Sequence, residues 1–186
     1  MKERSAVVAL MLVLAVLLAC KKKEQASPVT VSTSTSTGTT TGGTATGTTG
    51  DKAEAQALLE KFLAPGADYA SLTAALEPSS ADYTAVFGAD AAKAETYYTK
   101  MWKDPNAKIK PNAGQTQLLL FGTTTDLVSK DREFPGGYSK VRLQGKFPIY
   151  RWKFVERGKT LGMAYDGLVF VNGHFAFFPK PWRVGE

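Results

Sequence analysis

Reactive side chains are scarce in this 186-residue chain, which has one cysteine, Cys20, and one histidine, His174. A single cysteine excludes an intramolecular disulfide, so the folded part must be stable on its core alone. A single histidine excludes a metal site built from several histidines, and we expect no metal and no cofactor. A phosphate-binding loop is also missing, because Gly136-Gly137 lacks the lysine and the helix start that such a loop needs.

No apolar run is long enough to cross a bilayer. Residues 6–19 are apolar, and a helix of that length spans roughly 21 Å at ~1.5 Å per residue, short of a ~30 Å hydrocarbon core. Lys2 and Arg4 precede the run, and Leu17-Leu18-Ala19-Cys20 closes it. This order of charge, short apolar run and small residue predicts a secretory signal peptide. An uncleaved transmembrane anchor is the alternative, and the length argues against it.

The ending Leu17-Leu18-Ala19-Cys20 resembles the lipobox of bacterial lipoproteins. The resemblance implies that residues 1–19 are removed and that Cys20 is lipidated and becomes the first mature residue. Stable anchoring needs more than one acyl chain, which lipoproteins carry. The membrane is then a partner of the protein, and Cys20 is unavailable for thiol catalysis. Lys21 stands where an aspartate commonly retains lipoproteins in the inner membrane, so the resemblance implies the cell envelope and its outer membrane.

A segment of low complexity follows. Residues 29–50 contain eleven threonines, three serines and five glycines, with no apolar periodicity. Such a composition cannot bury a core, so we expect residues 20–50 to be a disordered tether between the membrane and a domain. At ~5–6 Å × √n, thirty residues reach roughly 30 Å. A glycosylated stalk and a β-prone tract that pairs with a partner are the alternatives.

Residues 51–186 have the length of one domain, and their first half predicts helices. Asp51 and Glu54 form a capping box, and apolar residues then recur at helical spacing to Leu63. We expect Asp68, Ser80 and Asp90 to cap three further helices.

The second half predicts strands. Residues 115–121 form a short apolar strand, residues 150–156 alternate with period two, and residues 161–171 and 174–178 flank the hairpin turn Asn172-Gly173. We expect a bulge or bend at Asp166-Gly167. Helices followed by an antiparallel meander predict an α+β fold, with the helices packed on a curved sheet. Residues 150–156, the hairpin 162–178 and Trp182 make this part similar to the NTF2-like, or cystatin-like, α+β roll.

The sequence shows no recognisable arrangement of catalytic residues. The hairpin register puts Asp166 opposite Pro179, roughly 16 Å from His174 at ~3.3 Å per residue, too far for a hydrogen bond. We therefore interpret His174 as a hairpin-tip residue near solvent. Enzymes with an NTF2-like roll pair an aspartate with a histidine or tyrosine in the open end of the roll. The carboxylates of the strand half show no such spacing; they are Asp126, Asp131, Glu133, Glu156 and Asp166.

The two halves of the domain carry net charges of opposite sign. Residues 51–99 carry eight acids and three bases, whereas residues 100–186 carry fifteen bases and seven acids. Arg151, Lys153 and Arg157 are candidates for binding an anion or an acidic envelope partner. A solvated sheet face is the simpler interpretation. We expect no nucleic acid, because of the location and because Trp152 alternates with Arg151 and Lys153 and so lies on the opposite face.

These observations predict a membrane-anchored lipoprotein whose domain is a non-catalytic binding or interaction module. Tyr150, Trp152 and Phe154 would line the pocket of the roll if that pocket is open, and form core if the helices fill it. Two alternatives remain. One is a small enzyme that uses a pocket carboxylate with a tyrosine, and the other is a subunit that binds a partner through its basic strands.

Overall fold

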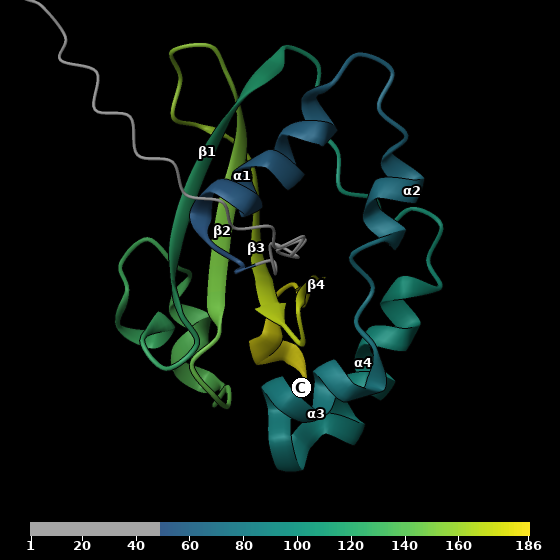
Figure 1. Ribbon diagram of the computed structural model, residues 1–186, viewed down its shortest axis with the longest axis vertical. Helices are drawn as coiled ribbons and strands as arrows, with labels where there is room; N and C mark the ends of the chain where they lie inside the picture. The colour runs from purple at the N-terminus through teal and green to yellow at the C-terminus, as the bar shows by residue number, and fades with distance from the viewer. Residues whose placement is uncertain (1–48) are drawn as a thin grey trace, which may run out of the picture. The chain divides into compact units, whose positions relative to one another are not determined.

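Helices come first and a sheet second, which confirms the predicted α+β class (Figure 1). The computed structural model describes residues 49–186. The predicted signal peptide, Cys20 and nearly all of the predicted tether lie outside the described residues. Within residues 49–186, none of the helices has the length and apolar composition that crossing a membrane requires.

Helix α1 (Lys52–Glu60) begins directly after Asp51, as predicted, but only the Asp51 half of the predicted capping box is formed. The Asp51 side chain accepts the Glu54 N–H at 2.9 Å. The Glu54 carboxylate binds the N–H groups of Thr49 and Gly50, and Tyr150 Oη donates to the Gly50 carbonyl at 2.8 Å. Hydrogen bonds therefore join Thr49 and Gly50, the last residues of the predicted tether, to the domain.

The next helices are α2 (Tyr69–Ala74), α3 (Ser80–Phe87) and α4 (Ala91–Trp102). Asp68 caps α2 as predicted. The prediction of Ser80 as the cap of α3 is wrong, because Ser79 forms a complete capping box with Asp82. Asp90 is the N-cap residue of α4, as predicted, but its side chain makes no capping hydrogen bond: a 3₁₀ turn leads directly into α4, and the Asp90 carboxylate accepts a hydrogen bond from Lys93 Nζ.

The sheet is an antiparallel meander in the order β1-β2-β3-β4. Its strands are β1 (Gln115–Thr124), β2 (Pro148–Glu156), β3 (Gly162–Val171) and β4 (His174–Phe177). The turn Asn172-Gly173 pairs Val171 with His174, as predicted. The predicted bulge lies at Gly167, whose φ is +92° and where a Cβ would come within 2.1 Å of the Phe178 carbonyl oxygen. Only glycine allows this close approach.

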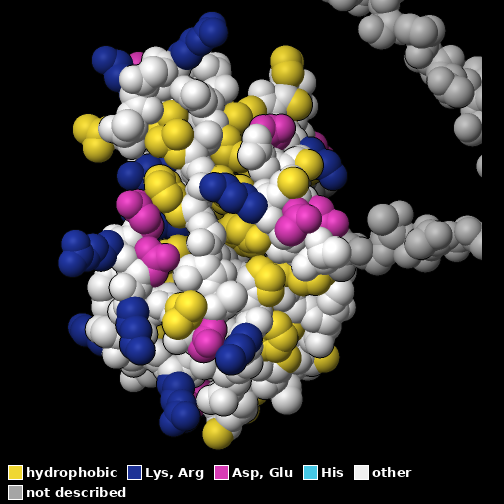
Figure 2. Space-filling view, turned by 60° about the vertical axis from the view of Figure 1, so that its left-hand side comes forward, with side chains coloured by type: hydrophobic (Ala, Val, Ile, Leu, Met, Phe, Trp, Pro, Cys, Tyr) yellow, Lys and Arg dark blue, Asp and Glu magenta, His cyan; other side chains and the backbone are white. Residues whose placement is uncertain are grey.

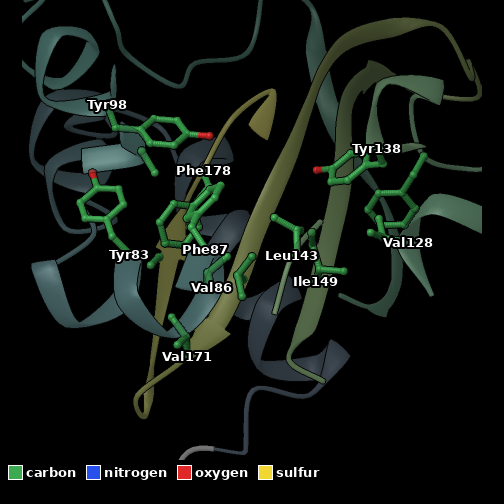
Figure 3. Close-up of a cluster of buried hydrophobic side chains, with 14 residues drawn as sticks. Tyr83, Val86, Phe87, Tyr98, Val128, Tyr138, Leu143, Ile149, Val171 and Phe178 are labelled. Atoms are coloured by element: carbon green, nitrogen blue, oxygen red, sulfur yellow. The ribbon is translucent and has the colours of Figure 1, made fainter. Parts of the chain in front are cut away.

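Two hydrophobic cores hold the fold together. The first packs side chains of α3 and α4 and of the 3₁₀ segments against Ile149, Val169 and Val171 of the sheet (Figure 3). The second packs Leu59 of α1 and Phe62 of the 3₁₀ turn that follows it against the other side of β2. Both cores lie inside one compact unit. The described domain therefore contains the buried apolar surface that stabilises it.

Candidate functional site

A groove lies beside the outer edge of β3. Strand β4 pairs only with Leu168–Val171, because the chain turns away at Pro179. The other half of β3, from Gly162 to Tyr165, has no strand partner on that side among residues 49–186. The segment that follows α4 lies across the gap, and the groove between them has a volume of about 310 Å³. Ligand sites typically fall in roughly this range and above it.

The walls of the groove are mainly apolar. The residues that contribute apolar surface are Met101, Trp102, Ala107, Ile109, Met163, Ala164, Tyr165, Phe177 and Pro179. Tyr165 is fixed firmly, because its hydroxyl donates to the Lys110 carbonyl at 2.9 Å and accepts the Lys110 N–H at 3.0 Å. Its ring stacks on Trp152, with centroids 5.2 Å apart. This wall is therefore formed before any ligand arrives.

Three charged side chains complete the groove. Lys108 and Lys180 are exposed, and Asp166 is partly buried. Oδ1 of Asp166 accepts the Tyr138 hydroxyl at 3.1 Å and the Lys180 N–H at 3.4 Å. Burial raises the pKa of Asp166, although these hydrogen bonds and the charges of Arg151 and Lys180 oppose the rise. A carboxyl with a raised pKa in a concave site indicates a functional residue.

The pair of Asp166 and Tyr138 is poorly arranged for catalysis. Tyr138 is 1% exposed, and its hydroxyl is directed to Asp166. Burial raises the pKa of Tyr138 well above its ordinary value, and the nearby charge of Asp166 adds to the effect. The tyrosine thus acts as a fixed hydrogen-bond donor to the carboxylate. Only Asp166 of this pair lines the groove, and within residues 49–186 no ion pair joins its carboxylate to the Lys108 or Lys180 side chain.

A second polar cluster lies where α3 meets the β3–β4 turn. Asp82 is completely buried and accepts hydrogen bonds from Ser79, from Asn172 Nδ2 at 2.7 Å and from His174 Nε2 at 3.1 Å. Burial alone would raise the pKa of Asp82, but the donors from Ser79 and Asn172 and the charge of His174 outweigh it, so the pKa is lowered.

This second cluster is structural. The Ser79 hydroxyl donates to the Asp82 carboxylate at 2.7 Å instead of facing the imidazole. A serine nucleophile needs the histidine as its base, so the arrangement does not activate the hydroxyl. The side chain of His174 is 45% exposed, in line with the predicted hairpin-tip position, but its carboxylate partner was not predicted. The pairs from Val171–His174 to Leu168–Phe177 follow the predicted register, and the carboxylate that contacts His174 is Asp82.

The three aromatic residues predicted to line a pocket lie in the second core. Tyr150 is 5% exposed, and Trp152 and Phe154 are fully buried beneath α1. The structure therefore has the filled arrangement, in which these side chains form core. Trp152 supports the groove from behind through its stacking on Tyr165, and it does not line the groove itself.

The predicted basic residues are only partly brought together. Arg151 and Lys153 share the face of β2 opposite Trp152, as predicted from the alternation. Arg151 donates to the Glu133 carbonyl, and Lys153 lies 5.8 Å from the centre of the Phe121 ring. Arg157 is exposed beyond the end of β2. No ion pair within 4 Å joins these three side chains to a carboxylate of residues 49–186.

No group of three or more metal-ligating side chains occurs within the part of the chain that the structure describes. Comparison with known proteins found no match for this chain among family models, curated proteins or solved structures.

Proposed function

We propose that the protein is a lipoprotein of the bacterial cell envelope, anchored through acyl chains on Cys20, whose domain is a non-catalytic binding module. The sequence Leu17-Leu18-Ala19-Cys20 supports the anchor. We also retain the NTF2-like roll as a proposed relationship, which the bend in β3 at Gly167 supports.

The proposed binding function rests on the groove beside β3. Its apolar walls favour a ligand with an apolar body, because burying apolar surface contributes about 25 cal/mol per Å². Its two exposed lysines, Lys108 and Lys180, favour an anionic group on that ligand, while Asp166 already has hydrogen-bond donors. The ligand class is therefore an amphiphilic anion.

Binding accounts for this groove better than catalysis does. The groove offers Asp166 without a second acid or base in contact with it on the ligand side, and the Tyr138 hydroxyl is buried behind it. The proposed basic-strand partner site is weaker, because Arg151 is engaged with the Glu133 carbonyl.

Titration with anilinonaphthalene sulfonate, an aromatic sulfonate, tests the binding site. We expect one saturable site, and an increase of about tenfold or more in the dissociation constant when Lys108→Glu and Lys180→Glu are combined. Lys130→Glu is the matched control, since Lys130 is an exposed lysine outside the groove. Equal weakening by the control, or binding that the double variant leaves intact, would contradict the groove. Circular dichroism checks that each variant is folded.

The anchor has a separate test. We expect Cys20→Ser to abolish incorporation of labelled fatty acid and to leave the protein unprocessed or released from the membrane fraction. A Cys20→Ser protein that remains labelled and processed would contradict the lipoprotein proposal and leave the groove unaffected.

A further inference from the structure

The outer edge of β1 is open. Strand β1 is the first strand of the sheet and pairs only with β2 (Figure 1). Within residues 49–186, no backbone group of residues 116–123 forms a backbone hydrogen bond to any element other than β2. A bulge disturbs the strand only at its start, between Gln115 and Gln117. Residues 117–124, which we call the β1 edge, are regular.

The β1 edge lacks the features that normally prevent strand pairing. Proteins protect open edges with charged residues, prolines, bulges or short strands. Residues 117–124 read Gln-Leu-Leu-Leu-Phe-Gly-Thr-Thr, with no charge and no proline. An edge of this length and composition is a template for another strand.

The apolar residues of the β1 edge are incompletely buried. Leu118, Leu119, Leu120 and Phe121 alternate between the two faces of the sheet, and all four are only partly buried. Figure 2, which brings this side of the molecule forward, shows hydrophobic side chains gathered between lysines and arginines. A further strand would cover these side chains on both faces and pair the free backbone groups.

The sequence of the β1 edge fits a second copy of itself. Two copies related by a two-fold axis pair antiparallel, and opposite residues must lie on the same face, so their numbers differ by an even amount. A register centred on Leu120 places Leu119 opposite Phe121 of the second copy and Gln117 opposite its Thr123. Leu118 then lies opposite Gly122, and no like charges are opposed.

Symmetry also favours this pairing over a head-to-tail one. A contact between the β1 edge and the free part of β3 would use different surfaces on each copy and extend without limit. Pairing of β1 with β1 is closed after two copies. We propose that the domain forms a two-fold dimer in which the β1 edges pair and the two sheets become one continuous sheet.

Analytical ultracentrifugation of the full chain in detergent tests the dimer with Leu119→Glu. Leu119 is the cross-strand neighbour of Lys153, so the monomer accommodates the new carboxylate. In the dimer each carboxylate lies opposite the apolar Phe121 of the second copy and diagonally across the two-fold axis from the other carboxylate. We expect the dissociation constant of the dimer to rise about tenfold or more. Leu161→Glu is the control, because Leu161 is 84% exposed and lies outside β1.

Cysteine cross-linking tests the register without relying on stability. We expect Leu120→Cys to form a disulfide-linked dimer, since opposite Cα atoms in an antiparallel pair are about 4.5–5.5 Å apart. Leu161→Cys measures the background, including any contribution of Cys20.

Several outcomes would overturn the proposal. They are a full chain that stays monomeric to about 100 µM, a dimer that Leu119→Glu leaves intact, and cross-linking of Leu120→Cys to a different protein. A monomeric full chain beside a dimeric fragment 49–186 would also overturn it, because the amino-terminal segment would then cover the edge. The fragment is suitable for this comparison, since both hydrophobic cores lie within it.

Discussion

Asp82 and Asp166 are both buried to some degree, yet their environments shift their pKa values in opposite directions. Asp82, with no exposed side-chain surface, accepts hydrogen bonds from three residues and has a lowered pKa. Asp166 is less buried, accepts two hydrogen bonds on one oxygen and has a raised pKa. Burial raises the pKa of both carboxyls; at Asp82 the hydrogen bonds from Ser79 and Asn172 and the charge of His174 outweigh it, whereas at Asp166 the opposing hydrogen bonds and charges do not.

The comparison separates a structural carboxylate from a functional one. Asp82 joins the start of α3 to the turn between β3 and β4, so its donors come from two segments of the fold. Asp166 lines a groove and has fewer donors than its oxygens can accept.

The largest expected effect is the loss of the cluster around Asp82. Asp82→Ala removes the acceptor for Ser79, Asn172 and His174, and we expect the free energy of unfolding to fall by about 3 kcal/mol. Urea denaturation followed by circular dichroism measures it.

The matched control for Asp82→Ala is Asp90→Ala. Asp90 is exposed and pairs only with Lys93, so we expect a change within about 0.5 kcal/mol. If Asp82→Ala costs no more than this control does, the cluster does not hold α3 to the hairpin.

Local elements could be predicted from the sequence because their signals lie within a few residues. The Asn172-Gly173 turn set the register of the last hairpin, and the Asp51 cap located the start of α1. The first residue of α3 was missed by one position, since Ser79 and Ser80 are adjacent and only the partnership of Ser79 with Asp82 distinguishes them.

The candidate site could not be predicted, because it joins residues that are distant in sequence. Tyr138 and Asp166 form a hydrogen bond although they are 28 positions apart in the sequence, and Asn172 and Asp82 do so at a separation of 90 positions. One signal was available: the predicted strand 161–171 is about twice as long as its partner 174–178. The unequal lengths already implied a free edge on β3, where the groove lies.

The smaller expected effect concerns Asp166, and its sign depends on pH. A raised pKa means that the folded state holds the proton more tightly than the unfolded chain does. The contribution of Asp166 to stability is therefore complete below the ordinary pKa of 3.8 and is lost as the pH rises through the folded-state value. Asp166→Asn resembles the protonated form at every pH and keeps an acceptor for Tyr138.

We therefore expect Asp166→Asn to match the wild type near pH 4 and to become the more stable protein toward pH 7, by less than the loss in Asp82→Ala. Urea midpoints measured across this range give the difference, with Glu133→Gln as an exposed control. The contribution of Asp82 has the opposite sign, since its lowered pKa makes it complete above 3.8 and lost as the pH falls through the folded-state value. A variant that is less stable than the wild type at pH 7 would mean that Asp166 is held as firmly as Asp82, and the distinction between the two clusters would disappear.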